Sequence, residues 1–333
     1  MSSTTVSVPI SVRSLRLVPA RCEVAVTSAP AISHSVLPDT SAAVPPALRG
    51  SAYRIGEPLC AGGMGQLYRA SHAALGRQAV LKVLHQKHLA RADHATRLRR
   101  EARILARLSG RHTPIVFDLG TLPDGRPYLV MEHLQGSDLK SEITRHGVLS
   151  VPSAIRVTVE LLAALAEVHD HGIVHRDVKL ENVFLCDDGR VVLLDFGVAQ
   201  IEEETLLETA PGFALGTPRS MAPEQISCED ADARSDVYAA GLVLYELLTG
   251  EGPFDDVASS VHGLRVAHCK RQPPRPSKRS PQPIPEPVER IVLRALSKKP
   301  ALRFATAREM ASALVAVGKY PFDREDDPTI VDD

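Results

Sequence analysis

Three oxygen-bearing side chains in the middle of the chain could together handle a hydroxyl group and a divalent cation. Asp177, within residues 175–182, could orient an incoming hydroxyl and accept its proton. The amide oxygen of Asn182 and the carboxylate of Asp195 are ligands that a hard cation such as Mg²⁺ prefers, with phosphate oxygens and water completing the shell. The set is therefore suited to moving a group from a metal-bound phosphate donor to a hydroxyl.

Two short apolar runs, residues 183–185 and 191–194, separate Asn182 from Asp195. Residues 187–190 read Asp-Asp-Gly-Arg, which is typical of the tight turn of a β-hairpin. A hairpin would return the chain to the start of its first strand, so we expect Asp195 to lie beside Asn182. Asp195 alone would be an ordinary acid in a turn after a strand, but its spacing from Asn182 favours metal binding.

Lys82 and Glu101 each carry a charge on a predicted element whose neighbouring residues are apolar. Lys82 ends the run Ala-Val-Leu-Lys on a predicted strand. Glu101 shares one face of a predicted helix over residues 97–108 with Leu98 and Leu105, while the arginines lie largely elsewhere. Each charge could also be exposed to solvent, but a buried charge is costly unless it is paired. We therefore expect the two to pair and to direct the Lys82 ammonium at the α- and β-phosphates of ATP.

A glycine-rich stretch, Gly62-Gly63-Met64-Gly65, precedes Lys82 between two predicted strands. Glycines permit a tight hairpin whose backbone N–H groups can approach a phosphate closely. Such a stretch is weak evidence by itself, but its position ahead of Lys82 supports a nucleotide phosphate site.

The elements that must position these residues divide the chain into a strand-rich part and a helical part. Strands are predicted at residues 53–59, 67–70, 79–84, 115–119 and 128–131. After Gly136 the periodicity is mainly helical, with long helices ending at Gly172 and Gly250. The final helices are predicted at residues 291–296 and 305–317. Between them and Gly250, the proline-rich and basic tract over residues 272–287 is predicted to be an exposed connection.

Composition limits the classes of partner and compartment. The net charge of −1 provides no general attraction to nucleic acid or membrane, and the five scattered cysteines form no CxxC pair that would indicate zinc. The cluster of His169, His171 and His175 is interpreted as loop and packing residues. No apolar run approaches the ~20 residues of a membrane span, and no secretory signal opens the chain. We predict a cytoplasmic protein with a disordered leader over residues 1–50 and an acidic, flexible tail over residues 318–333.

Taken in order, these motifs resemble those of the bacterial eukaryotic-like (Hanks-type) serine/threonine protein kinases over residues 53–317. The strings HRDVKLEN, DFG and GTPRSMAPE stand where that family has its catalytic loop, its metal-binding motif and the end of its activation segment. The resemblance implies an α+β, bilobal protein kinase fold, with a small antiparallel β-rich N-lobe (residues 53–131) and a larger, mainly helical C-lobe (residues 132–317). It also implies transfer of the γ-phosphoryl group of Mg-ATP to Ser/Thr hydroxyls of proteins, with Mn²⁺ as a substitute metal.

The resemblance assigns roles to individual residues. It implies that Asn182 and Asp195 hold the metal and that Met131 is the gatekeeper. Backbone groups of Glu132 and Leu134 would hold adenine. Catalytic roles are implied for Asp177, Lys179, Lys82 and Glu101. Contacts to ATP are implied for Ala61, Gly62, Gly63, Met64, Gly65, Leu67, Ala79, Lys82, Met131, Glu132, Leu134, Asp138 (at the ribose), Asn182 and Asp195.

Three further roles implied by the resemblance support the site from outside. Thr217 would form hydrogen bonds around Asp177 and Lys179, a geometry associated with Ser/Thr rather than Tyr substrates. Glu224 would pair with Arg303 as a structural ion pair. Asp236 would anchor the catalytic loop from the start of a buried helix.

Three positions depart from the family pattern. Cys60 replaces the first glycine of the glycine-rich loop, and because glycine tolerates positive φ we expect weaker or altered ATP binding. Ser220 replaces a tyrosine and should re-shape the substrate pocket, whereas Leu180 in place of proline is a mild change. Cys60 supports an alternative function, a catalytically weak kinase-like scaffold that binds nucleotide or a partner. Phosphorylation of a small molecule is disfavoured by the Ala-Pro-Glu string at residues 222–224.

Regulation is predicted from one arginine and three threonines. Arg176, beside the catalytic aspartate, would be satisfied by a phosphate on the activation segment, with Thr209 the preferred site and Thr205 the second. Both threonines could instead be plain exposed loop residues. In the tail, a phosphorylated Thr329 followed by Asp332 resembles a ligand of FHA domains, although an acidic solubilising tail explains the stretch equally well.

Overall fold

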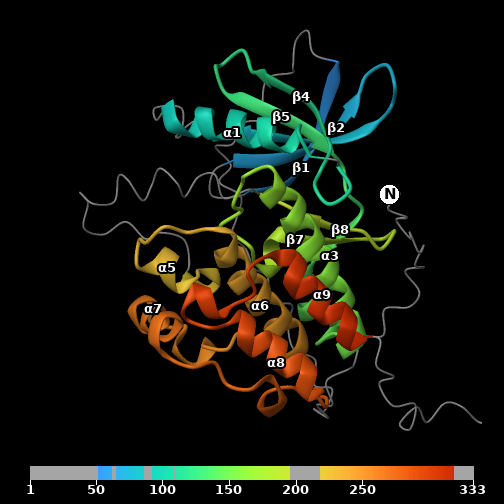
Figure 1. Cartoon of the computed structure of the whole chain (residues 1–333). Helices are drawn as coiled ribbons and strands as arrows, with labels where there is room; N and C mark the ends of the chain where they lie inside the picture. Colours follow the sequence, from blue (N-terminus) through green and yellow to red (C-terminus); the bar gives the residue numbers. More distant parts are fainter. Residues whose placement is uncertain (1–51, 62–64, 86–91, 109, 196–217, 319–333) are drawn as a thin grey trace, which may run out of the picture. The chain divides into compact units, whose positions relative to one another are not determined.

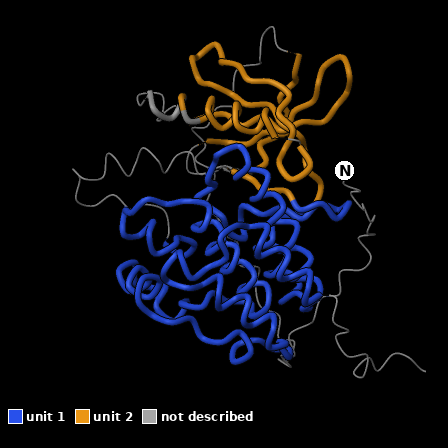
Figure 2. Tube along the Cα trace, viewed as in Figure 1, with its two compact units in different colours: residues 1–20, 137–191, 207–333 blue, residues 21–136, 192–206 orange. Residues whose placement is uncertain are grey.

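The computed structural model describes residues 52–61, 65–85, 92–108, 110–195 and 218–318. These residues divide into two compact units (Figure 2). The sheet unit comprises the described residues of 52–136 together with 192–195, and the helical unit comprises 137–191 and 218–318. The predicted leader, and the predicted tail beyond Gly318, lie outside the described residues.

The sheet unit is built on five antiparallel strands in the order β1-β2-β3-β5-β4 (Figure 1). Their bounds are β1 (Tyr53–Ala61), β2 (Gly65–His72), β3 (Gln78–Leu84), β4 (Val116–Thr121) and β5 (Pro127–Glu132). All five strands were expected from the sequence, and the observed ends differ by two residues at most. In β3 the buried Ala79, Leu81 and Val83 alternate with half-buried neighbours, which places Val80 and Lys82 on the opposite face.

Gly65 shows why the first hairpin needs a glycine. It pairs with Leu84 across β2 and β3, and a Cβ atom at Gly65 would lie 2.4 Å from the backbone oxygen of Val83. No side chain can be accommodated at that distance, so the strand that follows the glycine-rich stretch requires glycine at its start.

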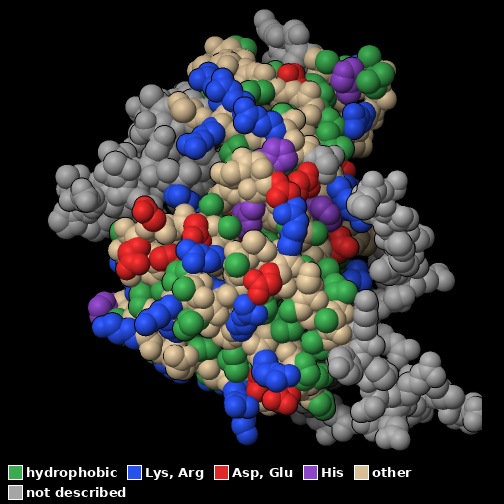
Figure 3. Space-filling view, viewed as in Figure 1, with side chains coloured by type: hydrophobic (Ala, Val, Ile, Leu, Met, Phe, Trp, Pro, Cys, Tyr) green, Lys and Arg blue, Asp and Glu red, His purple; other side chains and the backbone are tan. Residues whose placement is uncertain are grey.

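Helix α1 (Ala92–Leu105) packs on β4 and β5 with its apolar side. Leu98, Ala102 and Leu105 are buried, whereas Arg99 and Arg100 are exposed. Figure 3 shows basic side chains gathered over this helix on its solvent side. The predicted separation of the apolar stripe from the arginines is therefore confirmed.

The helical unit is centred on two long helices, α3 (Val151–Asp170) and α6 (Ala233–Thr249), which pack on each other (Figure 1). Gly172 at φ 71° and Gly250 at φ 82° follow their ends, as the sequence predicts. The remaining helices are α2 (Leu139–His146), α5 (Pro223–Ile226), α7 (Val261–Lys270), α8 (Glu286–Ala295) and α9 (Ala307–Gly318). None of the helices within the described ranges is long and apolar enough to cross a membrane.

Short strands β6 (Gly136–Asp138), β7 (Val183–Cys186) and β8 (Val191–Leu193) form a second sheet. The predicted turn between β7 and β8 is confirmed, because the N–H of Cys186 donates to the Arg190 C=O at 2.9 Å. At the end of β8, the N–H of Leu193 donates to the His112 C=O at 2.8 Å. This bond attaches the residues after the hairpin to the sheet unit.

The tract over residues 272–287 is exposed only in part. Its 3₁₀ turn η7 (Pro276–Lys278) begins with a buried proline, and the N–H of Ser277 donates to Glu289 at 3.0 Å. Farther along, Ser280 donates to the Leu248 C=O at 2.7 Å. The connection therefore lies on the helices instead of looping freely into solvent.

Candidate active site

In the sheet unit, Lys82 and Glu101 form an ion pair that is largely shielded from solvent, as the sequence predicts. The ammonium of Lys82 donates to both carboxylate oxygens of Glu101, at 2.9 and 3.1 Å. Strand β3 carries Lys82 away from the core face, and α1 carries Glu101 on its buried face. The pair thus links β3 and α1, which are separate elements along the chain.

Burial and charge act in opposite directions on this pair. Burial by itself would lower the pKa of Lys82, but the Glu101 and Asp195 carboxylates outweigh it and leave that pKa raised. Burial raises the pKa of Glu101, the Lys82 ammonium lowers it, and Asp195 raises it again. Lys82 therefore keeps its positive charge at neutral pH, which is the charge a phosphate ligand requires.

Asp195 completes the charged cluster of the sheet unit. Its Oδ1 accepts a hydrogen bond from Lys82 at 2.6 Å, although 62% of the Asp195 side chain is exposed. Its backbone lies at φ 46°, in the left-handed region that costs a non-glycine residue about 1–3 kcal/mol. Strain of this kind concentrates at functional sites, and here it accompanies an accessible oxygen ligand. Because Asn182 belongs to the helical unit, the approach of Asp195 to Asn182 stays a prediction.

In the helical unit, two side chains hold Asp177. Lys179 donates to both of its carboxylate oxygens, at 3.0 and 2.7 Å. Asn182 donates through Nδ2 to the Asp177 C=O at 2.8 Å and to its Oδ2 at 2.9 Å. The carboxylate of Asp177 is therefore fixed in orientation and balanced by one ammonium group.

The contacts of Asn182 fit the metal role that the resemblance implies. Both of its bonds to Asp177 use Nδ2, so the amide oxygen, which is the atom that Mg²⁺ would take, is not used in them. No group of three or more His, Cys, Asp or Glu side chains in the described ranges is arranged to hold a metal. Asn182 and Asp195 as ligands of Mg²⁺ therefore stay a prediction from the resemblance.

Asp236, at the start of α6, anchors the catalytic loop as predicted. Its carboxylate is 1% exposed and accepts from the N–H groups of His175 and Arg176, both at 2.8 Å. His169 contacts the same carboxylate through Nε2 at 2.8 Å. The sequence interpretation of His169 as a packing residue missed this contact, because the partner lies in a different helix.

The predicted pair of Glu224 and Arg303 is present and buried. Arg303 donates to the two Glu224 oxygens at 2.6 and 2.7 Å, and Ser235 donates to the same carboxylate at 2.6 Å. Burial opposes the charge of Glu224, but the bonds from Arg303 and Ser235 prevail and lower its pKa. The start of α5 is thereby fixed to the segment that precedes α9.

Arg219 has a partner that the sequence did not indicate. It lies in the 3₁₀ turn η5 (Pro218–Ser220) and donates through Nε to Asp255 at 3.0 Å and through Nη2 to the second Asp255 oxygen. A Cβ atom at Gly252 would lie 2.7 Å from Asp255, so glycine makes room for this pair. Ser220, one of the three departures from the family pattern, is the last residue of this turn and is therefore held with it.

The residues expected at the adenine and ribose lie within the described ranges. Met131 pairs with Val80 across β5 and β3. The N–H of Glu132 donates to the Ile115 C=O at 2.8 Å, so a contact from Glu132 to adenine would have to use its carbonyl. Asp138 caps α2 by accepting from the N–H and hydroxyl of Ser141, at 2.8 and 2.7 Å. A ribose would compete with this cap, and the contact stays a prediction.

The other predicted nucleotide contacts are only in part described. Leu67 pairs with both Cys60 and Lys82, Ala61 pairs with Gln66, and Ala79 is fully buried. Several predicted residues lie outside the described ranges: Gly62, Gly63, Met64, Thr205, Thr209, Thr217 and Thr329.

The structure changes the interpretation of Cys60. Cys60 lies in strand β1 and pairs with Leu67, so its backbone is extended. An extended backbone suits any residue, and the argument that Cys60 is strained at positive φ is wrong. Leu180, the second departure, is 3% exposed and packs in the helical unit.

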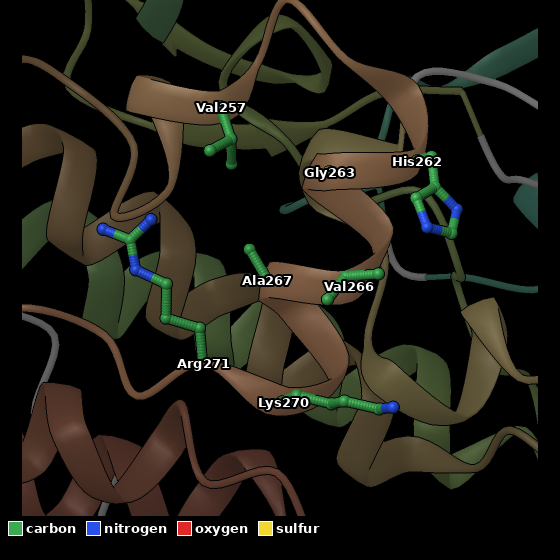
Figure 4. A pocket seen from close by; sticks show the side chains of 7 residues that line it. All are labelled: Val257, His262, Gly263, Val266, Ala267, Lys270 and Arg271. Atoms are coloured by element: carbon green, nitrogen blue, oxygen red, sulfur yellow. The ribbon is translucent and has the colours of Figure 1, made fainter.

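An open groove of about 510 Å³ lies along α7. Val257, in the turn η6 (Asp255–Val257), and Ala267 point toward one another across it, and Arg271 extends along one side (Figure 4). No predicted catalytic or nucleotide-binding residue lines this groove.

Comparison with known proteins agrees with this geometry. A family model of the protein kinase domain matches residues 53–315. The chain is 38% identical over 275 residues to the serine/threonine-protein kinase pkn3 of Myxococcus xanthus, covering 80% of this chain and 50% of that protein. It is 36% identical over 269 residues to the probable serine/threonine-protein kinase PknB of Corynebacterium glutamicum, covering 79% of this chain and 41% of that protein.

A solved structure is similar as well. A crystal structure of the Mycobacterium tuberculosis PknI kinase domain superposes with a TM-score of 0.62 at 28% identity, covering 80% of this chain and 96% of that one. The chain spans half or less of the lengths of pkn3 and PknB. The predicted α+β kinase fold, with an antiparallel sheet and a mainly helical part, is confirmed.

Proposed function

We propose that this chain, which belongs to the protein kinase domain family, transfers the γ-phosphoryl group of Mg-ATP to serine or threonine hydroxyls of proteins. The observation that carries the proposal is the arrangement at Asp177. Its carboxylate is oriented by Lys179 and Asn182, and its loop is anchored on the buried Asp236. A fixed carboxylate with a neighbouring ammonium group is what a hydroxyl-activating base requires.

The helical unit supplies the groups that act on the acceptor hydroxyl. Asp177 orients the hydroxyl and takes its proton, because its carboxylate is the accessible acceptor of this loop. Lys179, 2.7 Å from Asp177, is placed to offset negative charge as the phosphoryl group arrives. Asn182 would hold Mg²⁺ through its amide oxygen while its Nδ2 keeps Asp177 in place.

The sheet unit supplies the charge that binds the donor. Lys82 would turn its ammonium to the α- and β-phosphates while Glu101 holds it from the other side. Asp195, now bonded to Lys82, would exchange that partner for Mg²⁺. When bound, Mg-ATP would supply the transferred phosphoryl group, and its Mg²⁺ would offset the negative charge of the phosphates. Mn²⁺ as a substitute metal remains a prediction.

Incubation of the purified chain with γ-labelled ATP and a generic protein substrate tests the proposal. Wild-type protein should transfer label, and Asp177→Asn should reduce the rate by about 10²–10⁴-fold, the usual contribution of a general base. Equal labelling by both proteins would refute a role of Asp177. Absence of transfer by wild type would favour the scaffold alternative, which has lost its argument from strain at Cys60.

Several narrower predictions accompany the proposal. Autophosphorylation at Thr209, or second at Thr205, would place a phosphate near Arg176 and activate the chain. Thr209→Ala with unchanged autoactivation would exclude the first site. Binding of an FHA domain to phosphorylated Thr329 and a cytoplasmic location also remain predictions from the sequence. A pulldown with phosphorylated and unphosphorylated tail peptides tests the FHA partner.

A further inference from the structure

Gln225 is a buried polar residue that the sequence motifs did not single out. It is 3% exposed and follows Pro223 and Glu224 in α5. Its Oε1 accepts from the N–H of Ala222 at 2.9 Å, and its Nε2 donates to the C=O of Arg176 at 3.0 Å. A carboxamide carries a donor and an acceptor on one planar group, whereas an ionised carboxylate only accepts, so these two contacts suit glutamine and not an ionised glutamate.

The contact to Arg176 falls on a strained position. Arg176 has φ 68°, in the left-handed region that is unfavourable for a residue with a side chain. Its N–H is donated to Asp236 at 2.8 Å and its C=O accepts from Gln225. Both polar groups of the Arg176 backbone are therefore held by buried side chains, and the next residue is Asp177.

Gln225 also contacts Ala222, which lies in the GTPRSMAPE string at the end of the activation segment. Ala222 is fully buried and follows Met221, whose N–H donates to the C=O of Pro218 at 3.4 Å. The turn η5 therefore continues directly into the residue that Gln225 holds. One side chain thus bridges this turn and the backbone that carries Asp177.

We propose that Gln225 is a positioning residue that couples the turn over residues 218–220 to the orientation of Asp177. The proposal rests on the proposed kinase function. A displacement of Ala222 is passed through one rigid amide group to the Arg176 carbonyl, and Asp177 turns with it. Gln225 touches neither substrate nor nucleotide, so its loss changes the rate of transfer and not the binding of ATP.

Two substitutions of similar volume separate the two hydrogen bonds. Gln225→Glu keeps an acceptor for Ala222 but presents a second acceptor, with negative charge, to the Arg176 carbonyl. Gln225→Met removes both bonds while filling the same space. We expect kcat to fall about 10–100-fold in both variants, the scale expected for a catalytic group misplaced by about 1 Å. The KM for ATP should stay within about twofold, since the Lys82 cluster is untouched.

Gln282→Glu is the matched control. Gln282 also donates through Nε2 to a backbone carbonyl, that of Leu149 at 2.6 Å, in the same unit. Among the hydrogen bonds of the described residues, none joins Gln282 to the catalytic loop. The kcat of Gln282→Glu should equal that of wild type, which separates the general loss of a hydrogen bond from glutamine to backbone from the loss of the bond to Arg176.

Initial rates with varied ATP and peptide, and thermal unfolding of each protein, decide the matter. A fall in kcat for Gln225→Glu at unchanged ATP KM, with Gln282→Glu fully active, supports the coupling. Full activity of Gln225→Glu, or a fall in kcat matched by Gln282→Glu at equal melting temperature, overturns it while the kinase function stands. Absence of Asp177-dependent transfer by wild type overturns the kinase function, and the coupling with it.

Discussion

The Lys82 cluster of the sheet unit and the Asp177 loop of the helical unit are held by different kinds of contact. Lys82, Glu101 and Asp195 meet through side-chain ion pairs, and Asp195 is 62% exposed. The loop of Asp177 is held by buried carboxylate and amide groups that bond to its backbone, from Asp236 and Gln225. An exposed carboxylate such as Asp195 can exchange its partner at small cost, whereas buried backbone bonds cannot be released without leaving polar groups unsatisfied.

This difference matches the separate tasks that the proposed function gives to the two regions. A nucleotide site must release Asp195 from Lys82 when phosphate and metal arrive, so an exchangeable contact is suitable there. A proton acceptor must stay in one orientation, so contacts that cannot be exchanged are suitable at Asp177. Single substitutions in either region test this difference.

The largest effect is expected from Asp236→Ala. The substitution leaves the N–H groups of His175 and Arg176 without their buried acceptor, and each such loss costs about 1–3 kcal/mol. We expect the free energy of unfolding to fall by about 3 kcal/mol and phosphoryl transfer to drop below detection. Urea unfolding and a rate assay measure both.

Asp256→Ala is the control for that substitution. Asp256 forms an exposed pair with Arg271 at 2.6 Å, and its loss should leave the urea midpoint and the rate unchanged. Equal destabilisation by the two variants would contradict the view that the catalytic loop depends on a buried anchor.

Glu101→Gln tests the sheet unit. The neutral amide weakens the hydrogen bond to Lys82, and a charge-assisted bond of this kind is worth about 1.5–3 kcal/mol. Lys82 keeps its hydrogen bond to the Asp195 carboxylate. We expect the KM for ATP to rise about 10–100-fold with little change in the melting temperature. Glu57→Gln, in the exposed Glu57–Arg69 pair of the same unit, should leave KM unchanged. An unaltered KM in Glu101→Gln would mean that Lys82 does not need Glu101.

His268 is expected to lower the stability of the helical unit at acid pH. It is 1% exposed, and its Nδ1 lies 3.0 Å from the hydroxyl of Tyr238. Burial and the Lys298 ammonium lower the pKa of His268 from 6.5 to about 3. Between these values the unfolded chain binds a proton that the folded chain does not. Stability should therefore fall as the pH decreases from about 6.5 toward 3, by at most about 1.4 kcal/mol per pH unit.

The measurement is the difference between unfolding curves of wild type and His268→Gln from pH 7 to pH 4. The variant should lose the part of the slope that His268 contributes. His262→Gln, an exposed residue of the same helix, should keep the wild-type slope. Parallel curves for wild type and His268→Gln would show that His268 is not buried as a neutral ring.

The smallest effect is expected from Cys60→Gly. Because Cys60 is in an extended strand, restoring glycine relieves no strain, and the KM for ATP should change less than about threefold. Nucleotide titration of the two proteins measures it. Tenfold tighter binding by the glycine variant would restore the earlier interpretation that Cys60 impairs the phosphate loop.

Local patterns in the chain were sufficient for much of this molecule. Alternating apolar residues predicted the strands that carry Lys82, and helical periodicity placed Glu101 on an apolar face. The Lys82–Glu101 pair could then be predicted, because a charge on a buried face requires an oppositely charged partner and the sequence contains few other candidates. The hairpin between Asn182 and Asp195 followed from its turn residues, since turn chemistry is local.

Other contacts depended on where distant segments meet in space. Gln225 reaches a carbonyl at Arg176, Arg219 reaches Asp255, and His169 reaches Asp236. The residue type of a glutamine, an arginine or a histidine does not identify its partner, because the partner depends on which distant segments meet. The backbone angle at Cys60 was beyond sequence reasoning for the same reason, since strand pairing with Leu67 selects it. Residue types thus specified the charges and their need for partners, and long-range packing selected the partners themselves.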